Sequence, residues 1–259
     1  MMIQGKLALI TGASSGIGEA TAKAIAQQGG KVILVARSAA ELARVGGEIR
    51  EAGGQADWFA VDLSQAQAVV GVADSVVRTN GVPDILVNNA GAGRWLTIEE
   101  TEAAELEQMM ALPYFAAFNL TRELLPRMRQ RGSGHVVNVT SVAAKLVWPG
   151  AAGYAAARAA MSTWSKALAA ETYGSGIQVT LAMFGKVASP FWSHNPGSVE
   201  RLPKVNAYLP TLTTTQVAAS IVRAIQEKRE TIVLPRVFRL LFLVNALFPA
   251  TTARVLRLA

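Results

Sequence analysis

Residues 11–18 of the chain read TGASSGIG, and this glycine-rich stretch decides the predicted fold. An apolar run at residues 6–10 precedes it, and a helical pattern over about residues 18–28 follows it. Glycines allow a tight turn and a close approach of the backbone to a ligand, and a helix N-terminus offers free N–H groups. A strand, a glycine-rich turn and a helix in this order indicate a site for a dinucleotide pyrophosphate. Because the spacing is not G-x-G-x-x-G, a turn without a ligand is the alternative.

The amino-acid composition limits the class of protein and the kinds of site that the chain can have. The chain has 259 residues, 51% of them hydrophobic, which is enough for one large α/β domain with a substantial core. It has no cysteine, which excludes disulfides and thiolate chemistry. His135 and His194 are far apart and lack ligand-like neighbours, so we expect no metal site. No apolar run matches an ordinary spanning helix, and a strand this close to the N-terminus leaves no room for a signal peptide.

The net charge of +7 is concentrated near the C-terminus. Residues 228–259 hold six basic side chains and one acidic side chain, so most of the excess belongs to this tail. A nucleic-acid groove needs basic residues interleaved with exposed aromatic side chains, and no stretch has this pattern. We therefore expect no nucleic-acid partner.

Strand and helix patterns alternate along the chain. Apolar runs predict strands at residues 6–10, 31–36, 55–61, 84–87, 134–140, 177–183 and 231–234. Helices are predicted at residues 18–28, 38–52, 65–78, 97–110, 113–131, 153–173 and 213–227. This alternation predicts an α/β fold, a Rossmann-type doubly wound sheet of about seven parallel strands with helices on both faces. We predict one domain at residues 1–235, with a substrate loop at 184–210, and a C-terminal helical extension at 236–259.

Polar or small residues follow each of the first four predicted strands. Ligands of open parallel sheets bind at the carboxyl ends of the strands. The four ends are Thr11-Gly12, Arg37-Ser38, Asp62-Leu63 and Asn88-Asn89. One polar strand end is ordinary turn chemistry, but four along one rim predict the lining of a single cleft.

With these segments placed, residues 4–235 resemble the short-chain dehydrogenase/reductase (SDR) family. The resemblance rests on the motifs TGASSGIG at 11–18, Asp62-Leu63, NNAG at 88–91, and Ser141 thirteen residues before Tyr154. It implies a seven-stranded parallel sheet that binds NAD(P)H, and an oxidoreductase that interconverts a carbonyl and an alcohol.

The resemblance also implies which residues hold the cofactor. Gly12, Gly16, Ile17 and Gly18 would wrap the pyrophosphate, and Asp62 and Leu63 would frame the adenine. Asn88, Ala90 and Gly91 would lie beside the adenosine ribose and support the central strand, with Asn89 also among the cofactor-binding residues. Val187 and Ser189 would contact the nicotinamide carboxamide in a loop where Phe184 stands in place of the family's proline.

The end of the second predicted strand bears on the choice of cofactor. A carboxylate there would accept hydrogen bonds from the ribose hydroxyls and repel a 2′-phosphate, but residues 35–38 read VARS. The guanidinium of Arg37 can pair with a 2′-phosphate, and Ser14 or Ser15 can add a hydroxyl donor. We therefore expect NADP(H); a solvated surface side chain is the alternative for Arg37.

The resemblance places the chemistry at Ser141, Tyr154 and Arg158. In the family a tyrosine exchanges a proton with the substrate oxygen as hydride moves, and a serine hydroxyl hydrogen-bonds the same oxygen. A lysine four residues after the tyrosine, one helical turn away, binds the nicotinamide ribose and lowers the tyrosine pKa. Here Arg158 stands at the lysine position. Arginine keeps the charge and can donate to the ribose, but it does not readily release a proton.

A second departure concerns the asparagine that the family has in the long helix before the fifth strand. Residues 113–121 read PYFAAFNLT, so Pro113 occupies that position and Asn119 should face elsewhere. Proline has neither a side-chain amide nor a backbone N–H. Three functions therefore stay open: an active NADP(H)-dependent oxidoreductase, a cofactor-binding protein with little redox activity, and an enzyme that uses this fold for a different reaction.

The predicted loops around the cleft are rich in aromatic residues. These are Trp95, Trp148, Phe191, Trp192 and Tyr208. As substrate walls they would favour a small lipophilic carbonyl or alcohol. As core residues they would say nothing about the substrate.

The tail from residue 236 is apolar and basic. Residues 237–248 read VFRLLFLVNALF, and a second short helix carries Arg254 and Arg257. The tail can lie in a membrane interface with its arginines at lipid phosphates, or it can cover the pocket or a dimer partner. The resemblance implies a homodimer or homotetramer formed through the helices at 113–131 and 153–173. We expect a cytoplasmic protein, with peripheral contact to a membrane left open.

Overall fold

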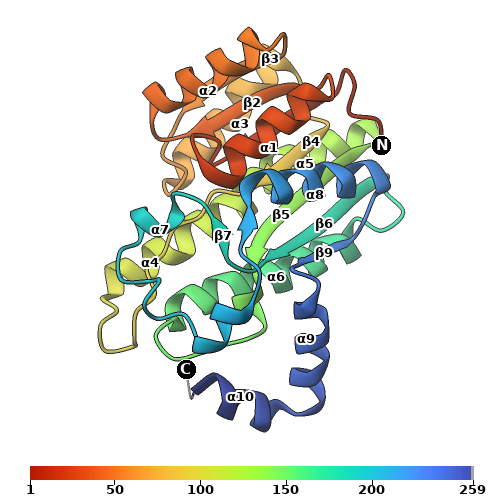
Figure 1. The fold of residues 1–259 in the computed structure, drawn as a ribbon. Helices are drawn as coiled ribbons and strands as arrows, with labels where there is room; N and C mark the ends of the chain where they lie inside the picture. The colour runs from red at the N-terminus through yellow and green to blue at the C-terminus, as the bar shows by residue number, and fades with distance from the viewer. Residues whose placement is uncertain (258–259) are drawn as a thin grey trace.

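Seven parallel strands form the central sheet of the computed structural model, which describes residues 1–257 (Figure 1). Their order is β3-β2-β1-β4-β5-β6-β9, so the winding direction reverses between β1 and β4. The strands are β1 (Leu7–Thr11), β2 (Lys31–Ala36), β3 (Gln55–Ala60), β4 (Ile85–Asn88), β5 (Gly134–Ser141), β6 (Ile177–Phe184) and β9 (Thr231–Leu234). Two short strands, β7 (Val187–Ala188) and β8 (Leu212–Thr213), pair beside it. The predicted Rossmann-type sheet is confirmed.

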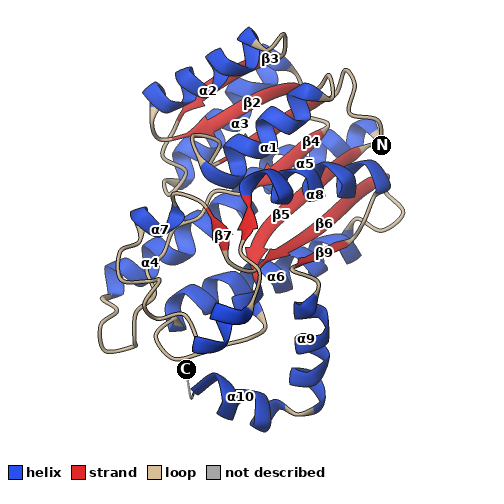
Figure 2. Ribbon diagram, viewed as in Figure 1, coloured by secondary structure: helices blue, strands red, loops and turns tan. Residues whose placement is uncertain are grey.

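Helices cover both faces of the sheet (Figure 2). They are α1 (Gly16–Gln27), α2 (Ala39–Glu51), α3 (Ala66–Asn80), α4 (Ala103–Met110), α5 (Ala116–Arg131), α6 (Ala152–Glu171), α7 (Phe191–His194), α8 (Thr214–Glu227), α9 (Val237–Leu247) and α10 (Pro249–Arg257). One apolar cluster joins α1, α2 and α8 to the sheet, and another joins α3, α5 and α6 to it. Parallel strands with both faces covered read as continuous apolar runs, which is the pattern seen in the sequence.

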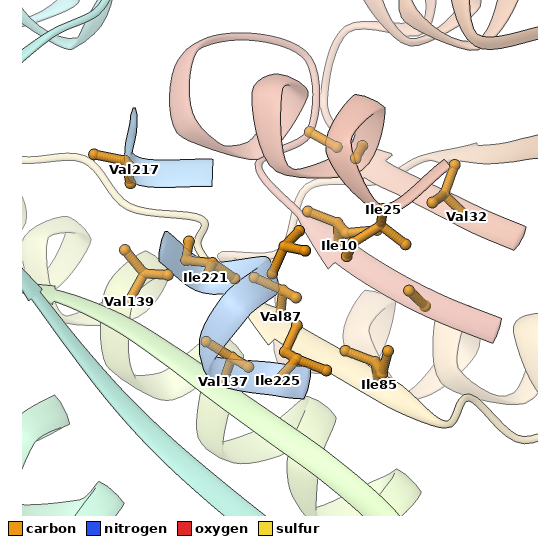
Figure 3. Packing of buried hydrophobic residues seen from close by; sticks show 14 of the residues in the cluster. Ile10, Ile25, Val32, Ile85, Val87, Val137, Val139, Val217, Ile221 and Ile225 are labelled. Carbon is orange, nitrogen blue, oxygen red and sulfur yellow. The ribbon is translucent and has the colours of Figure 1, made fainter. Parts of the chain in front are cut away.

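The face under α1 and α8 shows how packing positions the glycine-rich turn. Ile25 of α1 and Ile225 of α8 are fully buried with Ile10 and Val87 of the sheet (Figure 3). Each buried isoleucine contributes about 2 kcal/mol of transfer free energy. This packing holds α1 against β1, with its N-terminus at the carboxyl edge of the sheet.

Two predicted helices differ from the structure near the cleft. The helix expected from residue 97 begins at Ala103, because the Glu100 carboxylate accepts hydrogen bonds from the Thr97 N–H (2.8 Å) and Thr97 hydroxyl (2.9 Å), closing a turn instead. The helix expected from residue 113 begins at Ala116. A π-helical turn, Ala111–Phe115, precedes it and accommodates Pro113, which has no N–H to donate.

The C-terminal tail forms α9 and α10, as predicted, with residues 258 and 259 outside the described part. No single helix within residues 1–257 is long and apolar enough to cross a bilayer. The helices α9 and α10 reach the length and apolar composition of a membrane span only when they are taken together, and the chain bends by 118° between them.

Candidate active site

A cavity of about 1220 Å³ opens along the carboxyl edge of the sheet. It runs from the turn after β1 to the segment between β6 and α8 and to the tail helices. The predicted site residues that line it are Gly12, Ser14, Ser15, Gly16, Ile17, Arg37, Leu63, Asn89, Ala90, Gly91, Ser141, Tyr154, Arg158, Val187 and Ser189. The fold therefore brings these positions, which span most of the sequence, to one cavity. Gly18, Asp62 and Asn88 do not line it.

The glycine-rich turn is held tightly against β4. Gly12 has a φ of +64°, and its N–H donates to the Val35 carbonyl at 2.8 Å. The amide of Asn89 donates to the carbonyls of Thr11 (3.0 Å) and Gly12 (3.3 Å). A Cβ on Gly18 would collide with the Gly12 carbonyl oxygen, so Gly18 permits the close packing of α1 on this turn. The N-cap residue Ser15 makes no side-chain capping bond, which leaves the first N–H groups of α1 free for an anion.

Asn88 lies beneath the cavity, where it supports the central strands. Its Nδ2 donates to Asn138 Oδ1 (2.8 Å) and to Thr121 Oγ1 (3.1 Å), and Asn138 Nδ2 donates to Ser165 Oγ (3.1 Å). These bonds link β4, β5, α5 and α6. The buried polar network fixes the ends of β4 and β5, from which the 88–91 motif and Ser141 reach the cavity.

The Asp62 carboxylate forms hydrogen bonds within its own turn. Its Oδ1 accepts hydrogen bonds from the backbone N–H (3.0 Å) and the hydroxyl (2.8 Å) of Ser64. These bonds, with the nearby charge of Arg37, lower the pKa of Asp62. The carboxylate thereby shapes the turn that presents Leu63 to the cavity.

A cluster of charges surrounds the far end of the cavity, beyond the end of β2. Arg44 of α2 donates to Glu19 (3.0 Å), Glu41 (2.9 Å) and Glu48 (2.8 Å), and Lys23 donates to Glu19 at 2.6 Å. Burial alone would raise the pKa of Glu19, but the bonds from Arg44 and Lys23 lower it. Glu19, Glu41 and Arg44 all line the cavity beside Arg37. Arg44 and Lys23 therefore offset two of the three negative charges at this end.

Tyr154 and Arg158 occupy the middle of the cavity on one face of α6. Both side chains are buried, and the guanidinium carbon of Arg158 lies 4.8 Å from the Tyr154 ring centroid. A Cβ on Gly91 would approach Arg158 Nη2 to 2.7 Å, so any side chain there would require the guanidinium to shift. Arg158 Nε is buried and has no hydrogen-bond partner in the described structure. Arg158 thus places a positive charge beside Tyr154.

Ser141 ends β5 with its hydroxyl proton free. Its Oγ accepts a hydrogen bond from the Ala143 N–H at 3.2 Å, which fixes the oxygen and leaves the proton to donate elsewhere. Pro113, in contrast, is buried in the π-helical turn, and neither Pro113 nor Asn119 lines the cavity. The neighbouring Leu112 does line it.

An aromatic wall continues from Tyr154. Trp95 lies 5.6 Å from Tyr154, 5.0 Å from Trp148 and 5.4 Å from Trp192, measured between ring centroids. Phe191 lies 6.0 Å from Tyr154. Trp95, Trp148, Phe191 and Trp192 line the cavity and also pack against one another, so they are both substrate wall and core. The prediction was wrong for Tyr208, which is 88% exposed and does not line the cavity.

The tail helices close the same end of the cavity, which the sequence left as one of several alternatives. Phe238 and Leu241 of α9 and Leu256 of α10 line the cavity, and Leu256 packs against the cluster that contains Trp95 and Trp148. The apolar period of the tail indicated a buried face. The periodicity could not identify the partner of that face, because the residues that the face contacts lie far earlier in the sequence.

An ion pair joins two loops near this wall. Arg201 donates to Glu100 at 2.7 Å, and this bond, with those from Thr97, lowers the pKa of Glu100 to about 2. The pair connects the segment before α4 to the segment after α7. No group of three or more His, Cys, Asp or Glu side chains within residues 1–257 is placed to hold a metal ion.

The comparison with known families agrees with this geometry. A family model described as short chain dehydrogenase matches residues 6–197. The chain belongs to the short-chain dehydrogenase family. An uncharacterized oxidoreductase of Mycobacterium bovis is 38% identical over 228 residues, which are 86% of this chain and 64% of that protein. The chain therefore spans less than two thirds of that relative. A fatty acyl-CoA reductase of Acinetobacter baylyi is 34% identical, covering 87% of this chain and 75% of that protein.

Solved structures of the family share the fold. A short-chain dehydrogenase from Sphingobium yanoikuyae in complex with NADPH is 26% identical, with 95% of each chain covered and a TM-score of 0.82. A 3-ketoacyl-(acyl-carrier-protein) reductase from Brucella melitensis complexed with NADH is 29% identical, covering 90% of this chain and 97% of that one, with a TM-score of 0.79. The SDR neighbours of this chain thus include both NADP(H)- and NAD(H)-bound structures.

Proposed function

We propose that this SDR protein is an NADP(H)-dependent oxidoreductase that interconverts a carbonyl and an alcohol on a lipophilic substrate. The observation that carries the proposal is the Tyr154–Arg158 pair, buried in the cavity between the glycine-rich turn and the aromatic wall. Relatives described as fatty acyl-CoA reductase and ketoacyl reductase favour an acyl-chain carbonyl compound as the substrate class.

The charges at the end of β2 favour the phosphorylated cofactor. Arg37 is exposed at the cavity edge beside Ser38, and Arg44 donates hydrogen bonds to both Glu19 and Glu41. A 2′-phosphate dianion placed here meets the Arg37 guanidinium, and the carboxylates that line this end are hydrogen-bonded to Arg44. The free N–H groups at the start of α1 fit the pyrophosphate, and NADPH when bound supplies the hydride for reduction.

The remaining chemistry belongs to side chains of the chain itself. The Tyr154 hydroxyl is the proton donor to the carbonyl oxygen during reduction and the acceptor during oxidation. The free hydroxyl proton of Ser141 hydrogen-bonds the same oxygen and stabilises its developing negative charge. Arg158 places its positive charge 4.8 Å from the Tyr154 ring centroid, and its guanidinium can donate to a ribose hydroxyl.

The test is NADPH oxidation by the purified chain with medium- and long-chain aldehydes and ketones. Tyr154→Phe is the matched variant, because it keeps the ring that packs against Arg158 and Trp95 and removes only the hydroxyl. We expect the wild type to consume NADPH, and the variant to lose at least about 10²-fold in kcat. NADPH binding without turnover of any compound would instead support the cofactor-binding protein with little redox activity.

We also propose that the chain forms a homo-oligomer through α5 and α6. Phe115 and Phe118 are 49% and 41% exposed, and they form an aromatic cluster with Tyr114 and Trp164. Large exposed aromatic side chains gathered on one face are typical of protein interfaces.

A further inference from the structure

The helix α9 has two apolar faces, and only one of them is covered. Phe238 is buried, and Leu241 and Phe242 pack with it against the body of the protein. On the other face, Leu240, Leu243 and Leu247 are 60%, 55% and 63% exposed. These positions are three and four residues apart, so they form one stripe along the helix. Phe248 and Val255, 59% and 54% exposed, continue the apolar surface into α10. Figure 1 shows both helices projecting beyond the layers around the sheet.

The charges around this stripe have one sign. Arg236, Arg239, Arg254 and Arg257 are exposed, and none of them has an ion pair within residues 1–257. The sequence has no acidic residue after Glu230. A second copy of this surface would bring the same uncompensated arginines against these, so self-association through it is disfavoured. Anionic lipid phosphates above a hydrocarbon layer complement both the arginines and the leucines.

We propose that α9 and α10 dock on an anionic membrane surface, with Leu240, Leu243, Leu247 and Phe248 in the interface and the arginines at the lipid phosphates. The inner sides of the same two helices line the cavity through Phe238, Leu241 and Leu256. A single layer of helix therefore separates the docked surface from the aromatic wall beside Tyr154. A lipophilic substrate dissolved in the membrane reaches the cavity at this layer; this second part rests on the proposed reductase function.

Co-sedimentation of the full chain with vesicles tests the docking. Vesicles of phosphatidylcholine alone are compared with vesicles that also contain phosphatidylglycerol, at low and high salt. The variants are L240Q/L243Q, which alters the apolar stripe, and R239Q/R254Q, which removes two charges. The matched controls are I98Q, at a residue 80% exposed elsewhere, and R223Q on α8. We expect binding to anionic vesicles that salt weakens, a loss of at least tenfold in both test variants, and no change in the controls.

Three results would overturn the docking: a wild type that stays in the supernatant, test variants that sediment like the wild type, or a change in oligomeric state by L240Q/L243Q, which would assign the surface to a second copy. The delivery of substrate from the membrane is tested separately, by the rate of NADPH oxidation. We expect L240Q/L243Q to lower this rate with a long-chain aldehyde held in vesicles, and to leave it unchanged with a short water-soluble aldehyde. Vesicle binding without any turnover would refute the reductase function and leave the docking intact.

Discussion

At the scale of single residues, Arg158 is the side chain on which the chemistry depends. It lies one helical turn after Tyr154, with its guanidinium near both the tyrosine ring and Gly91. The glycine of the 88–91 motif therefore has a local purpose in this chain, because any side chain there would displace the guanidinium. A lysine is slimmer and would fit the same space with its charge retained.

We predict opposite outcomes for two replacements of Arg158. Arg158→Ala removes the positive charge beside Tyr154 and should lower kcat/KM by on the order of 10²-fold. Arg158→Lys keeps the charge, restores a group that can exchange a proton, and should equal or exceed the wild type. Steady-state NADPH oxidation measures both, with circular dichroism as the control for folding. An alanine variant as active as the wild type would refute the role given to Arg158.

Arg37 and Arg44 should determine cofactor preference in different ways. Arg37→Gln removes the partner of the 2′-phosphate and should weaken NADPH binding by tenfold or more while NADH binding stays the same. Arg44→Gln should do likewise because it leaves Glu41 without a cationic partner and Glu19 with Lys23 alone. Adding Glu41→Gln to Arg44→Gln should then restore part of the NADPH affinity. Fluorescence titration measures these affinities; equal losses for NADPH and NADH would contradict the prediction.

At the scale of elements, strands β5 and β6 bury a histidine that takes no part in the site. His135 Nε2 bonds Thr180 Oγ1 at 2.8 Å, and Thr180 Oγ1 donates to the Arg229 carbonyl at 2.5 Å. Because that hydroxyl gives its proton to the carbonyl, the histidine must be the donor at Nε2, which leaves Nδ1 unprotonated. Nδ1 is buried without a partner in the described structure. Burial accordingly lowers the pKa of His135 to about 4.

This burial predicts a loss of stability in mild acid. The unfolded chain binds the His135 proton near pH 6.5 and the folded chain only near pH 4, so stability falls as the pH drops through that window. Between pH 7 and pH 5 the loss should be about 2 kcal/mol. Urea unfolding at one protein concentration measures it, with His135→Gln as the variant that cannot titrate. The same pH dependence in the variant would rule out His135 as its source.

At the scale of the whole molecule, the exposed cluster of Phe115, Phe118, Tyr114 and Trp164 predicts self-association. Phe118→Glu places a charge in the centre of this cluster and should shift the oligomer to monomers. Sedimentation velocity measures the assembly state, with Ile98→Glu as the control, because Ile98 is 80% exposed and lies outside α5 and α6. A wild type that sediments as a monomer would contradict the proposed assembly.

The sequence by itself determined the sheet and the place of the cleft. Continuous apolar runs, polar strand ends and the TGASSGIG turn are local patterns, and a parallel sheet translates them directly into buried strands and a lined carboxyl edge. These patterns predict a shared cleft for the strand ends at Gly12, Arg37, Leu63 and Asn89, which line one cavity. The family resemblance, not the periodicity, implies the places of Ser141, Tyr154, Arg158, Val187 and Ser189. Two helices begin later than their sequence patterns predict. Glu100 closes a turn before α4, which begins at Ala103, and Pro113 lies in the π-helical turn before α5, which begins at Ala116.

Only the tertiary structure decided which side chains meet across long separations. It placed Arg44 among three glutamates from two helices, the Arg158 guanidinium against Gly91, and Leu256 of the tail beside Trp95 and Trp148. No periodicity carries this information, because a helix pattern states that a face is buried without naming its partner. The glycine-rich turn is a local motif and could be read directly, whereas the wall opposite it depends on packing between distant segments.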